Sequence, residues 1–379
     1  MNTTSGAPPI AFLDLPAQQK RIGAKLKQRV DTVMEHCRFV LGPEVTELEE
    51  KLATYGGAGH CVGVSSGTDA IQIVMMAENI GPGDAVFLPS FTYTATAEVP
   101  LLLGATPVFV DVDPETYQID PVNLRERIEK VRKEGKLKPR AIVGVDLFGL
   151  PAPWEVLRQI AAEYELFLMD DCAQAFGGSY QGHKLGHEAV ATTLSFFPSK
   201  PLGGYGDGGA ILTDDADRAE LYRSLRSHGE GKTRYEVLRT GMNGRLDTLQ
   251  AAVLLAKLEG FEKELIRRDE IAQAYTAGLE DIVIPPADVE DCQSAWAIYS
   301  ILLKDSDERT TTQGRLKAAG VPSAIYYPLP LHKQPAYRSH HDGVALPVSE
   351  SLAERILALP IHPELTDAEV ARVIAAVRG

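Results

Sequence analysis

Three short segments carry residue types that could do chemistry, and each follows a run predicted to be a β-strand. The first extends from Ser195 to Lys200, turns at Pro198 and leaves a lysine at the start of a glycine-rich stretch. A lysine amine can act as a nucleophile and as a carrier of protons. From its position alone, however, an ordinary surface lysine is the simpler interpretation, so the chemistry depends on the other segments.

The glycine-rich stretch after Lys200 contains a formal G-x-G-x-x-G pattern at Gly204, Gly206 and Gly209. In a dinucleotide-binding site this pattern follows a strand and opens a helix. Here it leads into the apolar run at residues 210–213, which is predicted to be another strand. The context therefore excludes a dinucleotide site.

The second segment places two adjacent carboxylates, Asp170 and Asp171, at the end of a predicted strand. A metal site or a solvated pair would also account for them. Successive strand residues point to opposite faces of a sheet, so only one of the two can face a given pocket. A buried carboxylate needs a cationic partner, and a protonated heterocyclic nitrogen would serve.

The third segment, SSGTD at residues 65–69, lies between a predicted strand and a predicted helix. Small residues and hydroxyls at a helix start usually form only an N-terminal cap. The same residue types also suit a phosphate, which needs free backbone N–H groups, hydroxyls and the positive end of a helix dipole. Both interpretations remain open for this segment taken alone.

A scaffold must bring these three segments together. Between about residues 61 and 213 the chain alternates short apolar runs with helical patterns. Strands are predicted at residues 61–65, 85–89, 106–111, 141–146 and 166–171, and helices at 68–78, 92–103 and 153–164. This alternation predicts βαβ units, and hence an α/β fold with a mostly parallel central sheet covered by helices on both faces. Ligands of such sheets bind at the carboxyl ends of strands, where all three segments lie.

The rest of the chain has a different pattern. A long helical pattern at residues 246–265 leads out of the first domain, followed by a strand-like run at 297–303 and helical patterns at 312–319 and 368–377. We predict a large α/β domain over residues 1–245, which begins with a helical segment, and a smaller C-terminal α+β domain over residues 246–379.

Composition restricts the classes of function. A net charge of −14 over 379 residues argues against a general binder of nucleic acid or of acidic membranes. The four cysteines are scattered and no histidine cluster has metal-ligand spacing, so free thiols and no metal site are expected. The first residues do not resemble a secretory signal, and no apolar run is long enough to span a membrane. A cytoplasmic protein is the expectation.

Together the segments resemble the DegT/DnrJ/EryC1/StrS sugar aminotransferases, which are fold-type I pyridoxal-phosphate enzymes like aspartate aminotransferase. The resemblance covers essentially the whole chain. It rests on motifs in a constant order: FLDL at 12–15, LGPE at 41–44, SGTDA at 66–70, PSFTY at 89–93, DCAQ at 171–174, SFFPSK at 195–200, GMNGRL at 241–246, YPLPLH at 327–332 and LP at 359–360. Residues 197–203, 205–209 and 245–252 resemble most closely the branch that aminates carbon 3 of UDP-2-acetamido-2-deoxy-3-oxo-glucuronate in O-antigen synthesis.

The resemblance implies pyridoxal 5′-phosphate as cofactor, with pyridoxamine 5′-phosphate as its intermediate form. Lys200 would form a Schiff base with the cofactor and then move a proton, while Asp171 would keep the pyridine nitrogen protonated. Asp170 would face the other side of the strand and be structural. The other implied cofactor contacts are Gly67, Thr68 and Ser195 at the phosphate, Tyr93 over the ring, Gln174 at the phenolic oxygen, and Asn243 at the phosphate from a second subunit.

The resemblance also implies partners for the cofactor site. L-glutamate is the expected amino donor, a nucleotide-linked keto-sugar is the acceptor, and a homodimer with shared active sites is the expected assembly. Candidate substrate contacts are His228, Arg245, Tyr326, Tyr327 and His332. The two histidines could equally be structural. Relatives often have histidine at the position of Tyr326, and this departure leaves the identity of the sugar open.

The motifs allow other functions. They fit equally the amination of an NDP-4-keto-6-deoxy sugar, or of another keto-sugar or cyclitol. Sugar dehydration is disfavoured, because the relatives that catalyse it have histidine in place of Lys200. The distant alternative is a non-catalytic cofactor-binding regulatory protein, although every expected catalytic position is filled.

Overall fold

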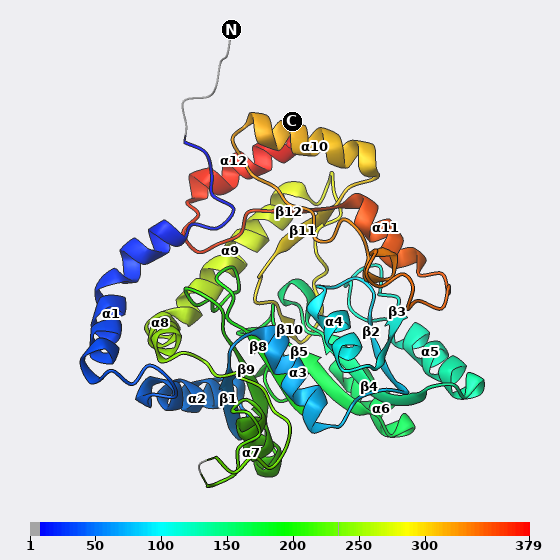
Figure 1. Ribbon diagram of the computed structural model, residues 1–379. Helices are drawn as coiled ribbons and strands as arrows, with labels where there is room; N and C mark the ends of the chain where they lie inside the picture. The colour runs from blue at the N-terminus through cyan, green and yellow to red at the C-terminus, as the bar shows by residue number, and fades with distance from the viewer. Residues whose placement is uncertain (1–7, 234) are drawn as a thin grey trace.

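The computed structural model describes residues 8–233 and 235–379. Its centre is a seven-stranded sheet with the strand order β1-β9-β8-β5-β4-β2-β3 (Figure 1). The strands are β1 (His60–Val64), β2 (Asp84–Pro89), β3 (Thr106–Val110), β4 (Lys138–Val145), β5 (Phe167–Asp171), β8 (Ala191–Ser195) and β9 (Gly209–Thr213). Within this sheet β9 runs antiparallel to both neighbours, and the remaining pairs are parallel. The predicted mostly parallel sheet is therefore confirmed, as is the strand that follows the glycine-rich stretch.

Helices cover both faces of the sheet, because strand residues alternate between two apolar cores. In β2, Val86 and Leu88 enter one core, whereas Ala85 and Phe87 enter the other. The first core contains α3 (Gly67–Ala77), α4 (Ala95–Leu102) and α7 (Ala216–Leu225). The second contains α2 (Pro43–Gly56), α5 (Pro121–Glu134) and α6 (Trp154–Tyr164). The predicted covering of both faces is confirmed.

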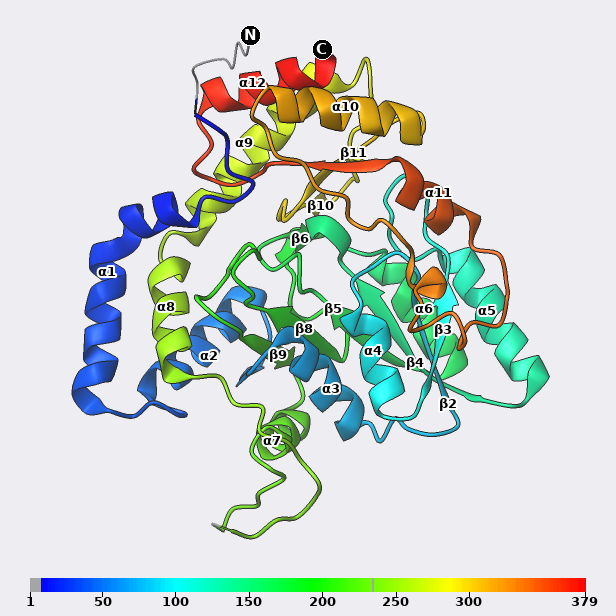
Figure 2. The same ribbon diagram turned by 45° about the horizontal axis from the view of Figure 1, so that its top comes forward.

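A smaller unit with its own core sits across one edge of this domain (Figure 2). Its core joins three helices and an antiparallel strand pair: α9 (Phe261–Leu279), α10 (Ser306–Ala318), α12 (Asp367–Arg378), β11 (Tyr299–Leu302) and β12 (Ile356–Leu359). The remaining elements are α1 (Leu15–His36), α8 (Thr248–Leu258), α11 (Pro347–Arg355), the short turns η1 (Leu147–Gly149) and η2 (Leu331–Lys333), and the short strands β6 (Ser179–Tyr180), β7 (His183–Lys184) and β10 (Cys292–Gln293).

The single helical pattern predicted at residues 246–265 is wrong, because the chain forms two helices there. α8 ends at Leu258, and Gly260 separates it from α9. The apolar side chains Leu254 and Leu255 of α8 pack into the second core of the large domain. On this packing we propose that the boundary between the two domains lies within α9 rather than at residue 245.

Two further observations complete the fold. The helix predicted at residues 92–103 starts only at Ala95, which leaves Tyr93 in the turn that follows β2. Among the described residues, no helix combines the length and the apolar character that crossing a membrane requires.

Candidate active site

A cavity of about 720 Å³ lies at the carboxyl ends of the parallel strands. Asp171 ends β5, Ser195 ends β8, and Ser66 follows β1, and all three line this cavity. Residues 297–298 and 325–329 of the smaller unit line it as well. The three segments that the sequence singled out therefore meet in one place, as expected for a sheet of this type.

Lys200 lies on the bend that follows β8, where its backbone N–H donates to the Phe197 carbonyl at 2.9 Å. Burial lowers the pKa of its ammonium group, and the charge of Asp171 partly opposes this shift. A lower pKa increases the fraction of neutral amine at neutral pH, and only the neutral amine is a nucleophile or a base. The surface-lysine interpretation is therefore not supported.

Asp171 is buried, with 6% of its surface exposed, and lies on the face of β5 that meets α4. Its Oδ2 accepts from the Thr96 hydroxyl at 2.9 Å, and its Oδ1 accepts from the Ala173 N–H at 3.3 Å. Burial raises the pKa of this carboxyl, while Thr96 and the charge of Lys200 lower it. A carboxylate has about four acceptor positions, so Asp171 keeps capacity for a cation that enters the cavity.

The start of α3 forms another part of the cavity wall, next to Ser195. Ser66 caps the helix by accepting from the Asp69 N–H at 3.0 Å, and the first N–H groups of the helix have no intrahelical acceptor. Gly67, Thr68 and Ser195 all line the cavity here. Free N–H groups, two hydroxyls and the positive end of a helix dipole form a suitable cradle for a phosphate.

The comparison with known proteins decides between the remaining interpretations. Residues 20–378 match the DegT/DnrJ/EryC1/StrS aminotransferase family. The chain belongs to this family. Its activity is pyridoxal-phosphate-dependent transamination. The residue types that line the cavity fit this cofactor, since an aldehyde reacts with an amine, a protonated ring nitrogen pairs with a carboxylate, and a phosphate binds free N–H groups and hydroxyls.

Individual relatives support the same fold and cofactor. The UDP-2-acetamido-2-deoxy-3-oxo-D-glucuronate aminotransferase of Pseudomonas aeruginosa is 44% identical over 369 residues, which is 97% of this chain and 99% of that protein. A family aminotransferase from Brucella abortus, solved by crystallography, matches with a TM-score of 0.95 at 47% identity, over 98% of this chain and 99% of that one. NtdA of Bacillus subtilis, solved with bound PMP, matches with a TM-score of 0.89 at 28% identity, over 100% of this chain and 86% of that one.

The cavity of this aminotransferase includes a link that sequence motifs did not predict. Gln174 accepts from the Phe148 N–H at 2.8 Å and donates to the Tyr327 hydroxyl at 3.1 Å. Tyr326 and Tyr327 both line the cavity, and so does the exposed residue Tyr93. Gln174 therefore connects the large domain with a wall that the smaller unit provides.

Two contributing residues had no recognised signal in the sequence. Thr96, whose hydroxyl donates to Asp171, lies in the first turn of α4 and belongs to no recognised motif. Arg268 of α9 lines the cavity although it is 3% exposed, and its Nη1 donates to the carbonyls of Trp296 and Ile361. Neither position could be connected with the strand ends until the chain was folded.

Four of the predicted site residues do not line the cavity in the single chain, and three of these lie on one segment. Asn243 and His228 are exposed and Arg245 is half-buried, on the irregular segment between α7 and α8. The bridge Ser227–Asn243 closes this segment on itself, and the bridge Val64–Arg245 ties it to β1. The structure therefore leaves these side chains available to another copy of the chain.

His332 is also away from the cavity, and it is 3% exposed. Its Nδ1 lies 2.6 Å from the Ser90 hydroxyl and its Nε2 lies 3.2 Å from Glu350. Burial lowers the pKa of this imidazole. Because both ring nitrogens have protein partners, the placement argues against the predicted substrate contact and indicates a structural role.

A methyl group at Gly67 is expected to weaken cofactor binding. A Cβ built on Gly67 would lie 2.8 Å from the Cβ of Ser195 and 3.2 Å from its hydroxyl. Gly67→Ala therefore forces Ser195 or the start of α3 to shift, and both line the place where we expect the phosphate. Loss of a hydrogen bond to the charged phosphate, at about 1.5–3 kcal/mol, raises the dissociation constant of pyridoxal phosphate by about 12- to 150-fold.

Titration of the cofactor-free protein with pyridoxal phosphate measures this constant. Gly314→Ala is the matched control, since a Cβ at this helical glycine meets nothing within 4 Å. Equal affinities for Gly67→Ala and the wild type would rule out phosphate binding between Gly67 and Ser195.

Proposed function

We propose that this aminotransferase transfers the amino group of L-glutamate to carbon 3 of a UDP-linked keto-sugar, UDP-2-acetamido-2-deoxy-3-oxo-glucuronate. The observation that carries the proposal is the meeting of Lys200 and Asp171 in a cavity of about 720 Å³, which can hold a cofactor and a sugar. The relative from Pseudomonas aeruginosa, whose name states this substrate, supports the choice of sugar. The product would serve the cytoplasmic synthesis of an O-antigen or another surface polysaccharide.

Each proposed role follows from the position of the side chain. Bound pyridoxal phosphate supplies a conjugated ring that accepts electrons from the substrate carbon. Lys200 binds the cofactor covalently through Nζ and then carries a proton at that atom, which its lowered pKa favours. Asp171 holds a proton on the ring nitrogen through a charge-assisted hydrogen bond, which is worth about 1.5–3 kcal/mol.

The remaining contacts orient the reactants. Gly67, Thr68 and Ser195 bind the phosphate, Tyr93 covers the ring, and Gln174 lies at the phenolic oxygen while it holds Tyr327. Tyr326 and Tyr327 face the sugar nucleotide. Arg268 is the arginine that lines the cavity in the described part of the chain, and it offers a positive charge to a substrate carboxylate.

A coupled assay tests the function. The keto-uronate is generated in situ from its UDP-sugar by a dehydrogenase, L-glutamate is supplied as donor, and the 3-amino product is sought by mass spectrometry. Formation of the product supports the proposal. A glutamate-dependent loss of cofactor absorbance without product would retain the aminotransferase and replace the sugar by a 4-keto substrate. No reaction with L-glutamate would contradict the proposed donor.

We further propose a homodimer in which Asn243, His228 and Arg245 act in the site of the other subunit. Their exposure at the surface of the single chain, outside its own cavity, supports this arrangement. In a two-fold dimer each site then combines Lys200 of one subunit with Asn243 of its partner.

Subunit mixing gives a direct test of this sharing. Lys200→Ala and Asn243→Leu should each be nearly inactive as homodimers. After denaturation and joint refolding, one site in each mixed dimer regains both wild-type residues, and about a quarter of wild-type activity should return. Refolding each variant alone is the control. Failure of the mixture to exceed the two controls would show that Asn243 acts within its own subunit or not at all.

A further inference from the structure

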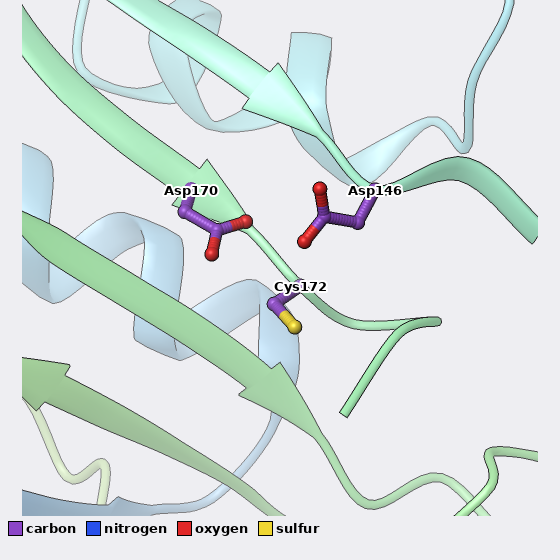
Figure 3. A group of neighbouring side chains, drawn as sticks. All are labelled: Asp146, Asp170 and Cys172. Carbon is purple, nitrogen blue, oxygen red and sulfur yellow. The ribbon is translucent and has the colours of Figure 1, made fainter. Parts of the chain in front are cut away.

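The carboxyl groups of Asp146 and Asp170 point toward each other between the ends of β4 and β5 (Figure 3). Asp146 follows β4, Asp170 precedes Asp171 on β5, and both side chains are fully buried. One oxygen of each and the sulfur of Cys172 lie within 4.8 Å of one another. Because strand residues alternate, Asp170 points to the α6 side of the sheet while Asp171 points to the cavity.

Each carboxyl group has one oxygen with protein donors and one without. Asp146 Oδ1 accepts from the Ala152 N–H at 2.7 Å and the Trp154 indole N–H at 3.0 Å. Asp170 Oδ2 accepts from the Thr192 hydroxyl at 3.1 Å. The other oxygens, Asp146 Oδ2 and Asp170 Oδ1, have no hydrogen-bond partner among the described residues. Buried polar atoms are almost always hydrogen-bonded, so these two acceptor oxygens need a shared hydrogen-bond donor.

Electrostatic repulsion and burial prevent Asp146 and Asp170 from being ionised at the same time. Burial and the nearby charge of Asp146 raise the pKa of Asp170 well above its usual range, and burial also raises the pKa of Asp146. Two carboxylates this close cannot both ionise in the interior of a protein. A single proton between the two free oxygens satisfies both acceptors and leaves one negative charge, which the donors on Asp146 stabilise.

We propose that Asp146 and Asp170 share one proton, and that this hydrogen bond is a positioning device that holds Asp171 at the cofactor. The pair joins the end of β4 to the end of β5, where the Asp146 N–H also donates to the Asp171 carbonyl at 3.2 Å. The positioning role rests on the proposed role of Asp171, whereas the shared proton does not.

The other titratable groups around the pair are Asp171, Cys172 and Cys292. Burial and the neighbouring carboxyls raise the pKa of the Cys172 thiol well above its usual range, and burial raises that of Cys292 to about 11. Both thiols therefore stay protonated. A divalent metal bound here would displace the proton of the Cys172 thiol, so the metal content of the protein distinguishes a metal from a shared proton.

Infrared spectroscopy of the cofactor-loaded protein tests the proton directly. With carbon-13-labelled aspartate, the wild type minus Asp170→Asn difference spectrum should contain the carbonyl band of a protonated carboxyl at neutral pH. In Asp170→Asn the amide N–H takes the place of the carboxylic acid O–H as donor to Asp146. The variant therefore keeps the hydrogen bond between the two residues but has no protonated carboxyl group. Absence of the band would overturn the proposal. So would a stoichiometric divalent metal in the wild type that Asp170→Asn loses.

The pH dependence of stability gives a second test that needs no catalysis. The folded pair keeps a proton that the unfolded chain has released above about pH 5, so wild-type stability should fall as the pH rises. The unfolding equilibrium constant of the wild type relative to Asp170→Asn should increase about tenfold per pH unit between pH 5 and 7. Parallel pH profiles of the two proteins would overturn the shared proton.

The positioning role has its own measurement, the pH midpoint at which the visible absorbance of the bound cofactor changes. Asp170→Asn should keep the wild-type midpoint, whereas Asp170→Ala should shift it by about one unit, because Asp171 loses its support and Asp146 becomes an unshared charge. Asp146→Ala breaks the same pair from β4 and should shift the midpoint as well. Equal midpoints in all variants would overturn the positioning role, while the coupled assay reports separately on the proposed function.

Discussion

Replacing Lys200 with alanine is expected to lower the rate of transamination by about 10⁴-fold or more, because one side chain supplies both the nucleophile and the base. The structure supports both roles, since burial lowers the pKa of the amine and the side chain lies in the cavity beside Asp171. Loss of cofactor absorbance after addition of L-glutamate measures the first half of the reaction. Mass spectrometry of the amino-sugar measures the second half.

The variant has a matched control and a rescue. Lys304 is an exposed lysine of the smaller unit, and Lys304→Ala should retain wild-type turnover. A small primary amine in solution should restore part of the activity of Lys200→Ala, because it can replace the missing base. Full activity of Lys200→Ala without added amine would assign the proton transfer to another residue.

The wild-type rate should also depend on pH through this amine. The neutral form acts and the pKa is lowered, so the rate of the proton-transfer step should rise with pH and reach its plateau below the usual range of a lysine. A plateau only at the ordinary lysine pKa would show that the buried environment does not persist in the working enzyme.

Replacing Asp171 with asparagine is expected to have the second-largest effect. The amide cannot stabilise a proton on the ring nitrogen, and breaking a buried ion pair costs about 3–5 kcal/mol. If this cost appears in the transition state, turnover falls by about 10²- to 10⁴-fold. The dissociation constant of the cofactor and the rate with L-glutamate, measured separately, would show how the loss is divided between binding and catalysis.

Asp170→Asn is the matched control for this variant, because it makes the same change one residue away on the other face of β5. The asparagine preserves the hydrogen bond to Asp146, so a much smaller effect on turnover is expected. Equal losses in the two variants would contradict the assignment of Asp171, rather than Asp170, to the cofactor.

The identity of the acceptor sugar depends less on these two residues than on the walls of the cavity. Tyr326 occupies a position where the resemblance led us to expect histidine, and the smaller unit brings it beside Tyr327 and Leu329. The coupled assay also tests whether the chain is a non-catalytic regulatory protein. Such a protein would bind pyridoxal phosphate without consuming L-glutamate.

Much of the fold could be predicted because its signals are local. Apolar runs that alternate with helical patterns predicted the parallel strands and the helices on both faces, and each bound of β1, β2, β3 and β5 lies within one residue of the prediction. The prediction of one helix at residues 246–265 was wrong because helical periodicity continues across the break at Gly260. Only packing shows that Leu254 and Leu255 of α8 lie in the second core of the large domain while Ile271 and Tyr275 of α9 lie in the core of the smaller unit.

The sequence by itself determined the family, the cofactor and the strand-end segments that hold Lys200, Asp171 and Gly67, because each segment is short and keeps its motif intact. Tertiary structure alone decided which distant side chains support them. Thr96 meets Asp171 across 75 residues, Gln174 meets Tyr327 across 153, and His332 turns to Ser90 across 242. Such pairs leave no local pattern, because a hydrogen bond depends on where two segments pack and not on their separation along the chain. The protonation of Asp146 and Asp170 depends on packing for the same reason, since only burial makes two carboxyl groups share a proton.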